Sequence, residues 1–159
     1  MSNNLSVTML KRRLNSALRL LVKEDLYLFN QGLHERTIVH KFATYLQIKF
    51  SKWDVDVEYN RNITDIKEIV TDSEEKKRII PDIIIHHRGM SENLLAIEVK
   101  SLQKPNRKSI EKDKIKLNRY KEQLGYRYAC FILFIIKNPM NHDPYRLETN
   151  PEPYKIEWI

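Results

Sequence analysis

The chain has 159 residues, 42% of them hydrophobic, which is enough for one domain with its own core. No apolar run reaches the roughly 18 residues of a membrane-spanning helix, and the polar start MSNN lacks the order of a secretory signal, so we expect a cytoplasmic protein without a membrane partner. The net charge of +7 favours an anionic partner such as nucleic acid.

Two helices are predicted in the first third of the chain. Apolar residues recur at helical spacing in residues 8–23, and again in residues 34–50. The breaker NQG at residues 30–32 separates the two helices. Glu35 lies in line with the apolar stripe of the second helix, at its first turn.

Strand patterns follow the two helices. Residues 53–60, WDVDVEYN, alternate strictly between acids on one face and apolar residues, ending with Tyr59, on the other. Residues 61–78 are polar and are predicted as a loop or short helix. Two apolar runs, 79–87 and 93–100, are separated by a turn-like RGMSE sequence, so we expect them to pair as a hairpin.

A basic helix and the most apolar strand complete the pattern. Ser109 can cap a helix that ends near Leu124, with Gly125 as its C-terminal stop. The run YACFILFIIK suits a fully buried strand in the middle of a sheet, and the single cysteine, Cys130, is expected to be buried within it. An irregular, Pro-rich stretch then precedes a last strand-like segment, YKIEWI.

This order of elements predicts an α/β (α+β) fold with a mixed sheet of about four to five strands flanked by helices. We expect a single domain that spans residues 1–159. Residues 1–32 would form an N-terminal helical extension and residues 33–137 the core. Residues 138–159 would form an irregular C-terminal segment with a short strand.

The basic excess is concentrated in one segment of the chain. Between Lys100 and Lys121 there are nine basic residues against two acidic ones, an excess that equals the net charge of the whole chain. A basic helix face can contact phosphates, although such faces are often only solvated. The candidate nucleic-acid-binding residues in and around this helix are Lys104, Lys108, Lys112, Lys116 and Arg119.

The predicted hairpin places charged residues in and beside its apolar strands. Asp82 opens the first strand directly after Pro81, while Glu98 and Lys100 share one face near the end of the second. The hairpin could therefore set Asp82 near Glu98. Two carboxylates this close repel each other unless a cation lies between them, and Mg²⁺ prefers such oxygen ligands.

With these residues the chain resembles the PD-(D/E)xK nuclease superfamily, which has the restriction-endonuclease-like fold. The matching residues are Pro81-Asp82 and Glu98-Val99-Lys100, with fifteen residues between the two acids. A helix follows the second half of the motif in that superfamily, as the basic segment does here. The resemblance covers residues 34–136 and implies a metal-dependent (endo)deoxyribonuclease, a hydrolase of EC 3.1 type.

The resemblance also implies a role for each residue. Asp82 and Glu98 would bind Mg²⁺, which Mn²⁺ could replace, together with the backbone carbonyl of Val99. Lys100 would orient or help deprotonate the attacking water and stabilise charge on the phosphate. Glu35 would bind the metal directly or through water, and with Asp82, Glu98 and Lys100 it completes the predicted catalytic set.

Other interpretations remain open from the sequence. The tripeptide [DE]xK by itself says little, because it occurs four times in the chain. A catalytically silent nuclease-fold module that binds nucleic acid or a protein partner would carry the same residues. A basic interaction protein with no site would leave Asp82 and Glu98 apart and solvated. DNA is the expected substrate, although charge does not rank DNA above RNA, and a homodimer would be needed to cut both strands in concert.

Overall fold

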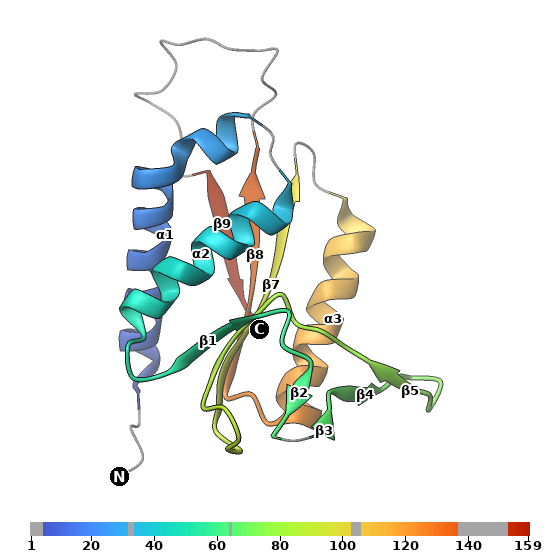
Figure 1. The fold of residues 1–159 in the computed structure, drawn as a ribbon. Coiled ribbons are helices and arrows are strands. Elements are labelled where there is room, and N and C mark those ends of the chain that lie inside the picture. The colour runs from blue at the N-terminus through green and yellow to red at the C-terminus, as the bar shows by residue number, and fades with distance from the viewer. Residues whose placement is uncertain (1–4, 32–33, 64, 103–105, 137–152) are drawn as a thin grey trace.

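The computed structural model describes residues 5–31, 34–63, 65–102, 106–136 and 153–159. It contains a five-stranded mixed sheet with the strand order β1-β6-β7-β8-β9. Helices α1 and α2 cover one face of this sheet and α3 covers the other (Figure 1). The predicted mixed sheet flanked by helices is therefore confirmed. The bounds of its strands are β1 Asp54–Val57, β6 Ile83–His86, β7 Asn93–Leu102, β8 Tyr128–Ile135 and β9 Tyr154–Trp158.

Helix α1 (Val7–Asn30) is longer than the predicted helix, which ended at residue 23. It begins at Ser6, whose side chain accepts a hydrogen bond from the backbone N–H of Met9. Asp25 has non-helical backbone angles inside it, and this kink interrupts the periodic apolar pattern. Beyond the kink Phe29 still packs in the core, so the helix continues to the NQG breaker.

Helix α2 (Glu35–Lys49) agrees with the prediction, and its buried stripe faces the sheet. The ring of Phe134 on β8 meets Phe29 of α1 and Phe42 of α2 in edge-to-face contacts, with centroid distances of 5.4 Å and 6.0 Å. Such pairs add to the stabilisation from burial. Both helices are thereby fixed against the centre of the sheet.

The predicted hairpin is confirmed as the antiparallel pair β6 and β7, with Ile83 opposite Ile97. Strand β7 also pairs in parallel with β8, and α3 makes the crossover between them. The apolar β8 is an interior strand, and Cys130 within it is fully buried as predicted.

Helix α3 (Arg107–Leu124) ends as predicted, because Gly125 adopts the left-handed conformation with φ of 68°. Its start differs from the prediction. Asn106, and not Ser109, caps the helix, and the Asn106 side chain accepts a hydrogen bond from the backbone N–H of Ser109.

The segment between β1 and β6 was predicted incorrectly. It forms two short antiparallel pairs instead of a loop or helix, β2 (Arg61–Asn62) with β3 (Asp65–Ile66) and β4 (Glu68–Val70) with β5 (Lys76–Arg78). The alternation predicted as far as Tyr59 also ends early. Strand β1 stops at Val57 because Glu58 takes a positive φ of 50°, and Tyr59 then packs on the α3 side.

Two apolar layers enclose the sheet. The larger lies between the sheet and helices α1 and α2, and includes Ile97 and Val99 of β7. The smaller lies under α3 and includes Ala96, next to which Glu98 points to the same side. Within the described residues, no helix has the length and apolar character needed to cross a membrane.

Candidate active site

The candidate site lies where β7 extends past the start of β6. Strand β6 pairs with β7 only as far as Ile83, so the next backbone N–H groups of β7 on that side need other partners. The backbone N–H of Val99 donates to Asp82 Oδ2 at 2.7 Å, and that of Ser101 donates to Glu35 Oε2 at 2.7 Å. Two of the predicted acids are thereby fixed along the same strand edge.

Glu98 is buried on the α3 side of β7, with only 3% of its surface exposed. Tyr120 of α3 donates a hydrogen bond to Glu98 Oε1 at 2.8 Å, and Lys116 Nζ lies 4.0 Å from Oε2. Burial, followed by the nearby charge of Asp82, raises the pKa of Glu98 to about 8.

Asp82 lies next to Glu98 across the hairpin, because it accepts the backbone N–H of Val99, the residue after Glu98, and its charge acts on the Glu98 carboxyl group. Burial raises the pKa of Asp82, while the hydrogen bond from the Val99 N–H and the charge of Lys100 oppose that rise. Since the pKa of Glu98 is about 8, its carboxyl group favours the protonated form at neutral pH, and a bound cation would compete with that proton.

Two lysine ammonium groups meet these acids. Lys100 Nζ lies 3.3 Å from Asp113 Oδ2 and 3.9 Å from Glu35 Oε1, and Lys116 Nζ lies 2.6 Å from Asp113 Oδ1. Together these groups carry four carboxylates and two ammonium groups, a net charge of −2 when all are ionised. We call them the acid–lysine cluster, which consists of Glu35, Asp82, Glu98, Lys100, Asp113 and Lys116.

A pocket of about 420 Å³ opens beside the cluster, between α2 and the end of β1. Glu35 and Asp82 contribute to its wall. Arg36 and Glu58 also line it and form an ion pair with a distance of 3.3 Å between Nε and Oε1. The pocket is lined by Glu35, Arg36, Val39, His40, Val57, Glu58 and Asp82.

The structure brings all four predicted catalytic side chains, Glu35, Asp82, Glu98 and Lys100, into this cluster. It divides the predicted nucleic-acid-binding residues. Lys108 and Lys112 are exposed on α3. Lys116 forms an ion pair within the cluster, and Arg119 forms one elsewhere. Lys104 lies outside the described residues.

Sequence reasoning missed two residues of α3, namely Asp113, which belongs to the cluster, and Tyr120, which contacts it. Asp113 falls on the helical stripe of Leu117 and Leu124, where an acid has no reason to be unless it has a buried partner. That spacing would have predicted a buried Asp113 with a partner of opposite charge. Tyr120 has no such signal, because its hydroxyl contact with Glu98 depends on packing between α3 and β7.

The donor atoms at this edge fit Mg²⁺ better than a softer metal. Among the described residues there is no group of three or more His, Cys, Asp or Glu side chains arranged to hold a metal ion. Mg²⁺ is commonly held by one or two carboxylates while it keeps several waters. The Asp82 and Glu98 carboxyl groups with a backbone carbonyl satisfy that requirement.

Comparisons with protein families, curated proteins and solved structures find no match. The superfamily assignment therefore remains a prediction from the motif residues.

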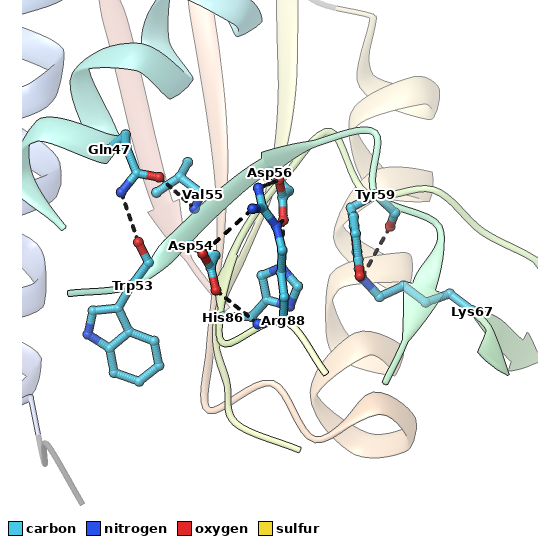
Figure 2. A network of polar contacts seen from close by, with 9 residues as sticks. All are labelled: Gln47, Trp53, Asp54, Val55, Asp56, Tyr59, Lys67, His86 and Arg88. Carbon is cyan, nitrogen blue, oxygen red and sulfur yellow. Dashed lines mark hydrogen bonds and ion pairs between the residues drawn. The ribbon is translucent and has the colours of Figure 1, made fainter. Parts of the chain in front are cut away.

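A second polar network lies at the opposite end of β6 (Figure 2). Asp56 of β1 accepts hydrogen bonds from Arg88, and its Oδ2 lies 2.8 Å from His86 Nε2. Asp54 Oδ2 accepts the backbone N–H of Arg88 at 2.9 Å. Burial raises the pKa of Asp56, but the hydrogen bonds from Arg88 and His86 outweigh it and bring the pKa below its ordinary value. This network therefore stabilises the edge strand β1 against β6.

Lys67 lies next to this network in the chain segment that follows β1 (Figure 2). Its side chain is 1% exposed, and its Nζ donates to the backbone carbonyl of Tyr59 at 3.1 Å. The ammonium group also lies over the rings of Tyr59 and Tyr126. Burial lowers the pKa of Lys67 to about 8. These contacts fix the β2–β5 segment to the sheet.

Proposed function

We propose that the protein is a Mg²⁺-dependent nuclease of the PD-(D/E)xK type that hydrolyses phosphodiester bonds of DNA. One observation carries the proposal. Asp82 accepts the backbone N–H of Val99, the residue between Glu98 and Lys100, so two acids and a lysine from two adjacent segments of the sheet meet at one strand edge.

A purely structural role accounts for only part of the cluster. Asp82 and Glu35 cap backbone N–H groups of β7, which is sufficient reason for an acid at each position. Glu98 is different, because it is buried against another carboxyl group and its pKa is raised to about 8. An acid with a strongly perturbed pKa next to a specific charged partner is a candidate for a functional site.

Three groups would hold the metal ion, namely the carboxylates of Asp82 and Glu98 and the backbone carbonyl of Val99. Val99 directs its N–H to Asp82, and in an extended strand the carbonyl of the same residue points to the same side. The net charge of −2 on the ionised cluster would be neutralised by one divalent cation. When bound, Mg²⁺ would polarise the phosphodiester and lower the pKa of water at that place.

The protein's own residues would bind and orient the substrate. Lys100 is 25% exposed at its side chain, so its ammonium group can approach a phosphate from within the cluster and stabilise the charge that develops there. Glu35 lies near this ammonium group and holds the edge of β7. The pocket between α2 and β1 gives access to Asp82, and a neighbouring phosphate there would compete with Glu58 for Arg36.

Nucleic acid as the substrate agrees with the charge of the molecule. The net charge is +7, and Lys108 and Lys112 are exposed on α3. Cationic side chains that bind phosphates release counterions, so binding should weaken steeply as salt is raised.

A cleavage assay tests the proposal. The wild type is incubated with supercoiled, linear and single-stranded DNA in Mg²⁺ or Mn²⁺, beside Asp82→Asn and Lys100→Ala. Asp65→Asn is the matched control, because this acid is exposed on β3. We expect metal-dependent cutting by the wild type and the control, and loss of cutting in the two site variants. DNA binding without metal and without cutting would instead support the silent binding module.

One acid–lysine cluster per chain can cut one strand at a time. If the protein converts supercoiled DNA directly to linear DNA, we propose that a homodimer cuts the two strands in concert. Light scattering at the assay concentration, with and without DNA, measures the mass. A monomer that linearises DNA in one step would contradict this.

A further inference from the structure

Asp113 stands out on α3 because it is an acid on the helix stripe that faces the sheet. Its neighbours on that stripe are Leu117, Tyr120 and Leu124, all of them buried. The Asp113 side chain is itself only 4% exposed. Burial of an ionised carboxylate costs several kcal/mol unless paired charges and hydrogen bonds compensate it. Asp113 therefore requires partners of opposite charge.

Both partners of Asp113 belong to the acid–lysine cluster. Its Oδ1 lies 2.6 Å from Nζ of Lys116, one turn further along α3, and its Oδ2 lies 3.3 Å from Nζ of Lys100 on β7. One carboxylate thus forms ion pairs with two ammonium groups from different elements, and only the pair with Lys116 has hydrogen-bond geometry. Glu35 is more distant from Lys100, at 3.9 Å. Asp113 is therefore the nearer of the two acids that contact Lys100.

A lysine side chain has a flexible four-carbon stem, so its ammonium group has no fixed position without such contacts. Charged groups assist a reaction most when they are already in place before the reacting charge develops. Lys100 needs a contact that fixes it without occupying the edge of β7 where Asp82 lies. Asp113 provides that contact from helix α3, whereas Lys100 itself lies on β7.

We propose that Asp113 is a positioning residue whose carboxylate holds the ammonium groups of Lys100 and Lys116 in place within the cluster, an inference that rests on the proposed function. Asp113 does not touch the scissile phosphate. It acts through Lys100, and through Lys116 it also keeps a positive charge near Glu98 Oε2.

Three variants test the role of Asp113 in the full-length protein. Asp113→Asn keeps the shape of the side chain and removes its charge, and Asp113→Glu restores the charge. Glu111→Gln is the matched control, because Glu111 is an acid on the same helix with a 66% exposed side chain, paired only with Lys114 among the described ion pairs.

The first measurement needs no enzyme activity. A fixed ammonium group exchanges its protons slowly enough to give an Nζ–H signal in ¹H–¹⁵N spectra, and Lys100→Arg and Lys116→Arg assign the two signals. We expect both signals in the wild type and in Glu111→Gln, and their loss in Asp113→Asn. Retention of the Lys100 signal in Asp113→Asn would overturn the proposal. If Asp113→Asn does not fold, the spectrum of the wild type tests the proposal. The absence of a Lys100 Nζ–H signal from that spectrum would also overturn the proposal.

The second measurement is DNA cleavage in Mg²⁺. We expect Asp113→Asn to lower kcat by about tenfold or more while KM stays nearly constant, because a misplaced ammonium group affects the reacting state more than binding. Asp113→Glu should recover part of kcat, and Glu111→Gln should match the wild type. An equal kcat in Asp113→Asn and the wild type would contradict the positioning role of Asp113 but not the proposed nuclease function. A wild type that keeps its Nζ–H signals but cuts no DNA contradicts the proposed function alone.

Discussion

Replacement of Glu98 by glutamine should stabilise the metal-free protein, because it removes a carboxyl group that is unfavourable in its charged form. Its pKa rises from an ordinary 4.5 to about 8, first through burial and then through the charge of Asp82. Between these pH values the folded protein binds a proton that the unfolded chain has released. The stabilisation from Glu98 is therefore complete below pH 4.5 and is lost as the pH rises toward 8.

The expected size of the effect follows from the shift. Each pKa unit corresponds to about 1.4 kcal/mol, and about 2.5 units separate pH 7 from the ordinary value, so Glu98 lowers the free energy of unfolding at pH 7 by about 3 kcal/mol. Glu98→Gln stays neutral and can still accept the hydrogen bond from Tyr120. Its stability should exceed that of the wild type at pH 7 by up to this amount and should match it within about 1 kcal/mol at pH 5.

Chemical denaturation in EDTA at pH 5, 6, 7 and 8 measures this difference, with Glu111→Gln as a control that should follow the wild type. Addition of Mg²⁺ should stabilise the wild type most at pH 8, where protons compete least with the cation for Glu98, and should have little effect on Glu98→Gln. Parallel pH profiles for the wild type and Glu98→Gln would refute the reasoning.

Three further substitutions test the structure around the two networks. Tyr120→Phe removes a buried hydrogen bond to Glu98 and should cost about 1–3 kcal/mol in denaturation at neutral pH, whereas an unchanged stability would mean that the hydroxyl makes no such bond. Phe134→Ala should cost about 3–5 kcal/mol, because its ring contacts both α1 and α2, and a loss below about 1 kcal/mol would contradict this packing. Asp56→Ala should cost about 1–3 kcal/mol at pH 7. The Asp56 pKa lies below its ordinary value, so this cost should disappear as the pH falls through the folded-state pKa, and a cost that persists in acid would exclude the ion pair with Arg88 as its source.

The parts of the fold that were predicted from sequence depend on local patterns. The β6–β7 hairpin follows from two apolar runs around a turn, and this alone was sufficient to set Asp82 beside Glu98. The end of α3 follows from Gly125, whose left-handed conformation is a local property. These features need no knowledge of distant contacts.

The parts that were missed depend on contacts between distant segments or on elements too short to show a period. Strands β2 to β5 have two or three residues each, so no alternation can be recognised in them. The end of β1 depends on the positive φ of Glu58, and the length of α1 depends on core contacts of Phe29 beyond its kink. Lys116 was predicted to bind nucleic acid, and its ion pair with Asp113 was missed because Asp113 entered only the total charge of the segment.

The two polar networks on the α3 side of the sheet differ in electrostatic character. Asp56 lies opposite Ile84 of β6, and its pKa is lowered because cationic and hydrogen-bonding partners surround it. That network lowers the free energy of the folded protein by itself. Glu98 lies across the hairpin from Asp82, and burial raises the pKa of both acids, while the charge of Asp82 raises that of Glu98 further. Asp56 is compensated by Arg88 and His86 of its own network, whereas Glu98 keeps an uncompensated cost of burial. A cation at the acid–lysine cluster, as proposed, would supply the missing positive charge.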